Sequence, residues 1–241
     1  MNYKQFYIIK ERAFFTNLFK LITLVLEELK NQIEKTGSVR PGRVYKVSLG
    51  DGYDLDVKFY KGYSRSAREY MAKNSLDDVS ALYFPKTTDS NGRIEIYINN
   101  SKKQTSYYKE RKFEDFVNKS LPKYIKDIIS HELTHAYEDI VRDVLKYKPD
   151  QQSNEKEYYS SDEEINAYIT QYVYKILQDG SDVSNNVKFY IKQKNIKSAC
   201  REIFSTIKDK KFVTNLDRDG KIKIIKIIYT IVTELVEKVV D

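Results

Sequence analysis

Cysteine, proline, glycine and histidine are scarce in this chain of 241 residues, and tryptophan is absent. The single cysteine, Cys200, excludes a disulfide framework and any metal site built from cysteines alone, and it fits a reducing compartment. Four prolines and eight glycines exclude collagen-like and low-complexity classes. Because 41% of the residues are hydrophobic, the chain is too apolar to be disordered and can bury a sizeable core.

Long hydrophobic runs are missing as well. The most apolar segment, residues 14–26, contains Asn17 and Lys20 and is shorter than the ~20 residues that a membrane-spanning helix needs. Charged residues at positions 10–12 interrupt the N-terminal region, and no small-residue cleavage site follows, so we expect no signal peptide. The sequence therefore predicts a cytoplasmic protein without a membrane span.

Basic residues exceed acidic ones by 42 to 35, which gives a net charge of +7. Such an excess is compatible with nucleic-acid binding, but the lysines are spread over the whole chain instead of forming one basic segment. Dispersed lysines are typical of a solvated surface. We therefore expect no specific nucleic-acid partner.

Hydrophobic spacing and turn residues predict an α+β fold. Apolar residues at three- and four-residue intervals predict helices over 14–33 (ending near Gly37), 123–147, 162–178, 187–208 and 219–240. Two β-rich pairs, 43–49 with 53–60 and 79–85 with 93–98, are each joined by turn formers and predict hairpins. We also expect a short polar helix over 105–119 and a loop over 148–159. The result is an N-terminal helix, a small, twisted, mostly antiparallel sheet and a series of helices.

Both histidines of the chain lie in the sequence His131-Glu132-Leu133-Thr134-His135. On a helix, residues four apart lie one above the other, with Cβ atoms roughly 5–6 Å apart. Two imidazoles placed in this way can both bind one zinc ion through bonds of about 2.0–2.1 Å. Glu132, one step around the helix, can then take a proton from a water molecule that the metal activates.

Catalytic zinc usually has three protein ligands, so a third ligand is needed. With no other histidine, this ligand must be a carboxylate, and the predicted helix over 162–178 offers Glu163 and Glu164 near its start. Ser161 precedes Glu164 by three residues, which is the spacing of a helix capping box, and Ser160 has the same relation to Glu163. Either glutamate is therefore a candidate ligand and either is a candidate cap.

These motifs resemble those of the gluzincin zinc metallopeptidases, which combine H-E-x-x-H with a glutamate from a downstream helix. HELTHAYE at 131–138 matches the motif helix, and Glu164-Ile-Asn-Ala resembles the third-ligand helix. The Glu-Glu pair is also similar to that of clostridial neurotoxin light chains. The resemblance implies one zinc ion bound by His131, His135 and Glu164, with Glu132 as the general base and acid.

The resemblance covers roughly residues 43–180 and does not account for the first helix or the last sixty residues. We expect residues 1–180 to form a zincin-like metallopeptidase domain, and residues 181–241 a helical extension that packs on it or continues it. Strand 93–98 would be the edge strand along which an extended peptide substrate lies. The order of strand, active-site helix and ligand helix is that of a minimal gluzincin.

One departure concerns the oxyanion of the transition state. Thermolysin-type members stabilise it with a further histidine, and this chain has none. Tyrosine or arginine must take that role in an active enzyme. Tyr168 lies one helical turn after Glu164 and is the candidate, while Tyr172 and Arg142 are further options.

The sequence therefore predicts a zinc-dependent endopeptidase that acts on a peptide or protein substrate. The alternative is a zinc-binding protein of the same fold that has lost catalysis and serves as a structural or interaction module. A basic nucleic-acid-associated protein with an incidental histidine pair is the third hypothesis.

Overall fold

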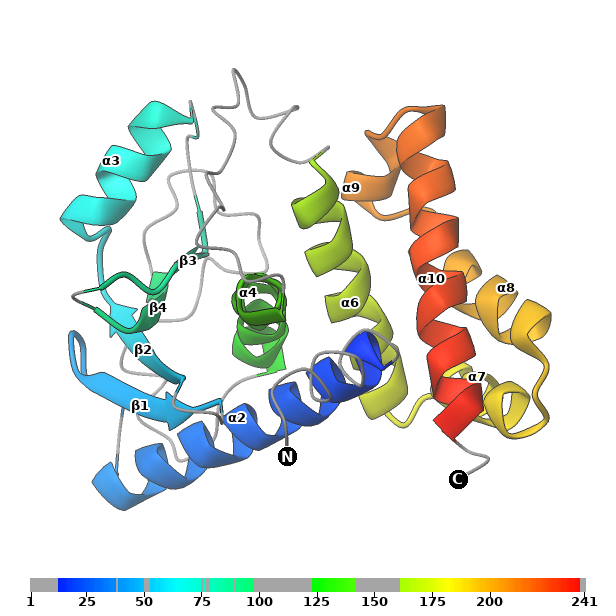
Figure 1. Cartoon of the computed structure of the whole chain (residues 1–241), viewed down its shortest axis with the longest axis horizontal. Helices are drawn as coiled ribbons and strands as arrows, with labels where there is room; N and C mark the ends of the chain where they lie inside the picture. The colour runs from blue at the N-terminus through cyan, green and yellow to red at the C-terminus, as the bar shows by residue number, and fades with distance from the viewer. Residues whose placement is uncertain are drawn as a thin grey trace. The chain divides into compact units, whose positions relative to one another are not determined.

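A computed structural model describes residues 13–97, apart from 38, 50–52, 75, 77–78 and 89, together with 123–141 and 161–238. These residues form eight helices and a mixed four-stranded sheet (Figure 1), which confirms the α+β class. The predicted helix over 105–119 and loop over 148–159 lie outside the described residues, as does the part of the predicted 123–147 helix that follows Val141.

The chain divides into two compact units, which are described separately. The first unit is Leu21–Tyr158, and the second combines Met1–Lys20 with Tyr159–Asp241. The long helix α2 (Phe14–Thr36) contributes residues to both. It ends at Gly37, whose φ of 72° is the left-handed conformation that the predicted stop requires. The ligand helix predicted over 162–178 groups with the C-terminal helices.

The sheet of the first unit has the strand order β1-β2-β4-β3. Its strands are β1 (Val44–Ser48), β2 (Asp54–Tyr60), β3 (Ala81–Phe84) and β4 (Gly92–Tyr97). The two predicted hairpins, β1 with β2 and β3 with β4, are antiparallel, whereas β2 and β4 pair in parallel. Because β4 has a partner on each side, the expectation that 93–98 is the edge strand is wrong. Among the described strands, β3 lies at that edge.

Helix α3 (Arg65–Lys73) covers one face of this sheet and was not predicted. Ser64 starts the helix, because its Oγ accepts the backbone N–H of Ala67. Ala67 packs against Leu82 of β3, and Met71 is the other buried residue of the helix. With only two buried positions, the apolar spacing is too short to be recognised in the sequence.

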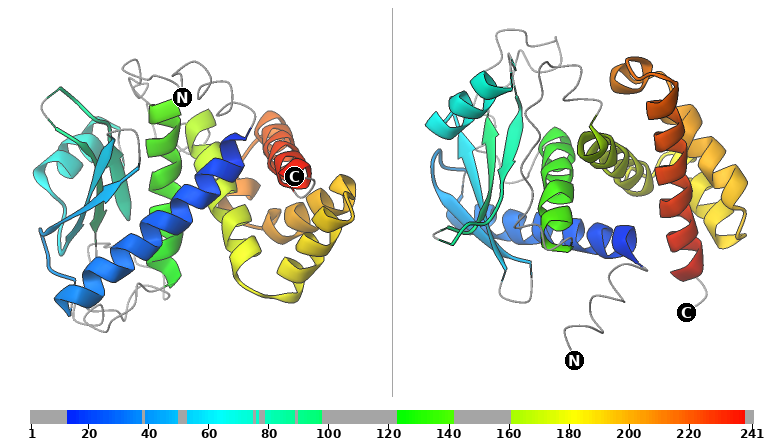
Figure 2. Two further views of the ribbon diagram at one scale, coloured as in Figure 1. Left: turned by 60° about the horizontal axis from the view of Figure 1, so that its bottom comes forward. Right: turned by 45° about the horizontal axis from the view of Figure 1, so that its top comes forward.

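Helix α4 (Lys123–Val141), which carries both histidines, lies on the opposite side of the sheet from α3 (Figure 2) and packs against β3 and β4. Neighbouring residues of a strand point to opposite faces, so Leu82 reaches α3 while Tyr83 reaches α4. The hydroxyl of Tyr83 donates a hydrogen bond to Asp139 of α4. The predicted apolar face of α4 is buried at Ile125, Ile129, Leu133 and Ala136.

The second unit is helical. It contains α6 (Asp162–Gln178), α7 (Asp182–Lys192), α8 (Ile196–Ile207), α9 (Lys211–Thr214) and α10 (Arg218–Lys238), and α10 packs against α6, α7 and α8 (Figures 1 and 2). The single helix predicted over 187–208 is wrong, because Lys194 has a φ of 54° and Asn195 caps a new helix there. No helix in the described part of the chain is long and apolar enough to cross a membrane.

Candidate metal centre

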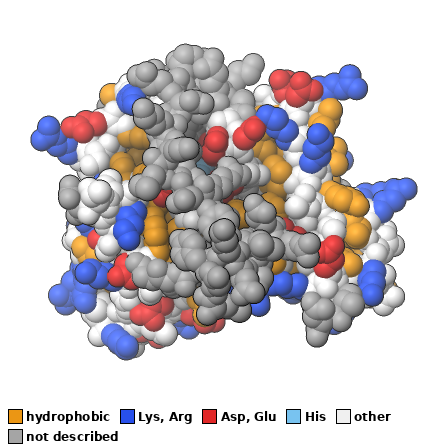
Figure 3. All heavy atoms as spheres, viewed as in Figure 1, with side chains coloured by type: hydrophobic (Ala, Val, Ile, Leu, Met, Phe, Trp, Pro, Cys, Tyr) orange, Lys and Arg blue, Asp and Glu red, His pale blue; other side chains and the backbone are white. Residues whose placement is uncertain are grey.

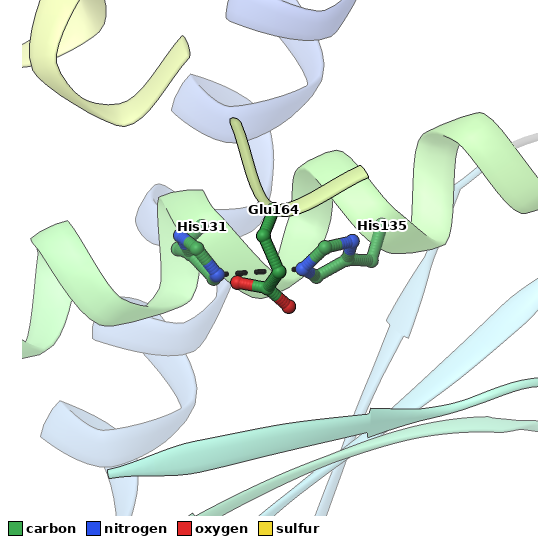
Figure 4. Close-up of side chains that lie close together, drawn as sticks. All are labelled: His131, His135 and Glu164. Carbon is green, nitrogen blue, oxygen red and sulfur yellow. Dashed lines mark hydrogen bonds between the residues drawn. The ribbon is translucent and has the colours of Figure 1, made fainter. Parts of the chain in front are cut away.

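His131 and His135 face each other across one turn of α4 (Figure 4). Their Nε2 atoms are 3.3 Å apart, and the two rings are nearly perpendicular, with an interplanar angle of 78°. This geometry follows from the four-residue spacing on a regular helix. His131 is buried and His135 is half-buried, so both imidazoles are largely shielded from solvent.

The carboxylate of Glu164 completes a group of three potential metal ligands. One ligand atom from each of His131, His135 and Glu164 lies within 4.8 Å of the other two, and Figure 4 shows the carboxylate in front of the imidazoles. Glu164 is 5% exposed, although it is an acidic residue in the first turn of its helix. Two nitrogen donors and one carboxylate oxygen at this spacing can hold a metal ion.

The capping function at the start of α6 uses the backbone of Glu164 and leaves its side chain for the ligand group. Ser161 Oγ accepts the backbone N–H of Glu164 at 3.3 Å, which is the predicted N-cap. The side chain of Glu164 lies beside the imidazoles. The Ser161 half of the predicted capping box is therefore formed, and the carboxylate of Glu164 belongs to the group of potential metal ligands.

The neighbouring acidic residues are placed differently. Glu163 is half-buried and does not belong to the ligand group, so the structure favours Glu164 of the two candidates. Asp162 forms an ion pair with Lys223 of α10. This contact raises the pKa of Lys223, because the positive charge is stabilised by the hydrogen bond to Asp162.

Glu132, the predicted general base, follows His131 directly and is buried at 7% exposure. The pKa of Tyr97 on β4 is raised, chiefly because the phenol is buried and secondly because its hydroxyl is hydrogen-bonded to Glu95. The charge of Glu132 is a smaller cause of the same shift. The Tyr97 hydroxyl donates to Glu95 at 2.7 Å and stays protonated at neutral pH. A buried glutamate thus follows the first histidine directly in the chain.

Tyr168, the predicted oxyanion residue, lies one turn after Glu164 on α6. Its ring stacks on Phe212 of α9 with centroids 4.9 Å apart, and the ring of Tyr172 stacks on the same phenylalanine at 5.5 Å. Both tyrosines therefore have their rings held by packing within the second unit. Arg142 lies outside the described residues.

One polar cluster beside the histidines was not predicted. Asp139 lies four residues after His135 on α4 and receives hydrogen bonds from Tyr53 and Tyr83. The four-residue spacing places Asp139 on the histidine side of the helix, and that signal is present in the sequence. The partners of Asp139 come from distant segments and carry no such signal.

Comparison with known proteins adds no relative: no family model, no curated protein and no solved structure matches this chain. The functional conclusion therefore rests on the residues of the site and their geometry.

Proposed function

We propose that this protein is a zinc metallopeptidase of the gluzincin type, with His131, His135 and Glu164 as the metal ligands and Glu132 as the general base and acid. The observation that carries the proposal is the convergence of the three ligand atoms within 4.8 Å, because they come from segments far apart in the sequence. A histidine pair without function would need no buried carboxylate beside it.

The donor set fits zinc. Two tetrahedral ligands at bonds of about 2.0–2.1 Å from one zinc ion stand roughly 3.3 Å apart, and the Nε2 atoms of His131 and His135 are 3.3 Å apart. With both Nε2 atoms as ligands, each neutral ring carries its proton on Nδ1. Two imidazoles and one carboxylate also make up the ligand set of known catalytic zinc peptidases, which leaves one position open for water or substrate.

Zinc, when bound, supplies a Lewis acid that polarises the scissile carbonyl group and lowers the pKa of water to about 7. Glu132 then takes a proton from the attacking water and donates it to the leaving amine. The burial of Glu132 suits this role. A carboxylate with little access to solvent exchanges its proton with a neighbouring group more readily than with bulk water.

The edge of the sheet supports a peptide as the substrate. β3 pairs with β4 on one side, and among the described strands it has no neighbour on the other. An extended peptide can add to such an edge by main-chain hydrogen bonds. β3 also packs against α4, the helix that carries the histidines.

Metal content tests this assignment directly. We expect the purified protein to contain one equivalent of zinc, and Glu164→Ala and His135→Ala to lose it, whereas Glu163→Ala retains it as the matched control. Zinc at 100 times its dissociation constant stabilises the binding-competent protein by about 2.7 kcal/mol, so the melting temperature of the wild type should rise with zinc and that of Glu164→Ala should not. Full zinc affinity in Glu164→Ala would contradict the proposed ligand set.

An activity assay on the same purified protein distinguishes the peptidase from the alternative, a zinc protein without catalytic activity. The observation that favours the alternative is that both histidines of the chain are used as ligands, which leaves no imidazole for the oxyanion. A peptide library incubated with protein of confirmed zinc content decides between them. Turnover that chelation abolishes supports the peptidase, and full zinc occupancy without turnover supports the silent protein.

A further inference from the structure

Helix α10 exposes a stripe of large hydrophobic side chains. Ile222, Ile225 and Tyr229 are 40%, 50% and 56% exposed and recur at three- and four-residue intervals, so they lie along one face of the helix. A separate face, about 110° around the helix, anchors α10 in its unit through Ile224 and Ile228, which are fully buried. The exposed stripe is therefore additional to what folding of this helix requires.

Basic side chains surround this stripe. At about 100° per residue, Arg218 continues the stripe toward the start of the helix, and Lys221 and Lys226 flank it by about 70° on either side. All three are exposed, and Figure 3 shows hydrophobic and basic side chains side by side over α10. Asp219, the acidic residue of the helix nearest to the stripe, is exposed about 90° from the centre of the stripe and about 20° beyond Lys226. The face is thus apolar at its centre and positively charged along its margins.

The size and charge of this face indicate which kind of partner can bind to it. From Ile222 to Tyr229 the stripe is about 10 Å long, whereas a stable protein interface takes about 20–30 residues from each partner. A second copy of the chain would bring Lys221 and Lys226 against the same lysines, which repel each other. A lipid surface needs no complementary groove, since a few apolar side chains and several lysines each add to binding.

We propose that this face of α10 docks on a membrane surface that contains anionic phospholipids. Ile222 and Ile225 enter the boundary between headgroups and acyl chains, and Tyr229 lies at headgroup level with its hydroxyl in contact with water. Lys221 and Lys226 bind the anionic headgroups. The helix lies in the plane of the surface and does not cross it. This inference is independent of the metal centre.

Vesicle co-sedimentation of the full-length protein tests it. We expect binding to vesicles of equal parts phosphatidylcholine and phosphatidylserine, little binding to phosphatidylcholine alone, and a decrease with added salt. Replacing Lys221 and Lys226 with Gln should lower the affinity about fivefold for each lysine. The triple variant Ile222→Ser/Ile225→Ser/Tyr229→Ser should lose binding at least about tenfold.

The matched control removes exposed hydrophobic residues elsewhere. Leu24 and Phe189 are 62% and 57% exposed, and Leu24→Ser/Phe189→Ser should bind vesicles as the wild type does. Unchanged circular dichroism and melting temperature establish that each variant is folded. Wild-type protein that does not sediment with the anionic vesicles overturns the proposal, as does equal loss in the control. A concentration-dependent dimer that only the triple variant abolishes also overturns it, because the face would then be a contact between copies.

Discussion

The hydroxyl of Tyr83 donates a hydrogen bond of 2.7 Å to Oδ2 of Asp139, and so ties the edge strand β3 to the helix that carries the histidines. Tyr53 joins the pair, with its hydroxyl 3.0 Å from that of Tyr83 and 3.4 Å from the same carboxylate oxygen. Gly92 leaves room for them, since a Cβ there would stand 3.0 Å from the Tyr53 hydroxyl. The position of β3 relative to His135 is thus fixed by polar contacts.

Removal of the Tyr83 hydroxyl should destabilise this arrangement. Tyr83→Phe leaves the partly buried Asp139 carboxylate without its shorter hydrogen bond, and we expect a loss of about 1–3 kcal/mol in the free energy of unfolding, measured by urea denaturation. Tyr53→Phe is the matched control and should cost less, because its bond to Asp139 is longer. An equal loss in both variants would contradict the primary role of Tyr83.

Glu234 of α10 should make stability depend on pH. Its Oε2 accepts the backbone N–H groups of Phe15 and Thr16 at 2.8 and 3.2 Å, at the start of α2. Burial raises the pKa of Glu234 above its ordinary 4.5, and these two hydrogen bonds offset the shift only in part. The folded protein therefore holds this proton more tightly than the unfolded chain. Ionisation of Glu234 then lowers the stability as the pH rises from below 4.5 through the raised pKa.

Glu234→Gln lacks this titration. We expect the difference in the free energy of unfolding, wild type minus Glu234→Gln, to decrease as the pH rises from below 4.5 to neutral. Urea denaturation at each pH measures this difference. Glu27→Gln changes the same charge at an exposed position of α2, is not among the groups that act on Glu234, and should show the pH dependence of the wild type. Parallel pH curves for the wild type and Glu234→Gln would refute this account.

Local signals predicted the helices with clear ends. Ser161 and Gly180 delimit α6, and its residues 162–178 agree with the prediction because both caps are contained in a few neighbouring residues. The parallel pairing of β2 with β4 was missed, because it joins segments more than thirty residues apart. The break at Lys194 was missed as well, since the apolar spacing continues across it.

In the candidate site, too, the features set by neighbouring residues were predictable and those set by distant segments were not. The His131–His135 pair was predictable, because one helix fixes its geometry. The preference for Glu164 over Glu163 came from the resemblance to the gluzincins and not from helix geometry, because neighbouring residues on a helix differ by about 100° and only tertiary structure decides which of them reaches the histidines. The contacts of Asp139 with Tyr53 and Tyr83 were missed because they too depend on tertiary structure.

Glu132→Gln should separate metal binding from hydrolysis. Glutamine preserves the shape of the side chain but cannot take the proton, so zinc content should stay at the wild-type value while peptide cleavage falls at least about 10²–10⁴-fold. Glu163→Gln makes the same chemical change beside the third ligand and should cleave like the wild type. Wild-type turnover by Glu132→Gln would remove Glu132 from the mechanism.

Tyr168→Phe tests the residue proposed to stabilise the oxyanion. The substitution keeps the ring that stacks on Phe212 and removes only the hydroxyl, so folding and zinc content should not change. If the hydroxyl donates to the oxyanion, kcat should fall about 10²–10³-fold with little change in KM. Tyr172→Phe is the matched control, because its ring stacks on the same phenylalanine one turn further along α6. Equal kcat values for the two variants and the wild type would assign the oxyanion to another group and leave Tyr168 as a packing residue of α6 and α9.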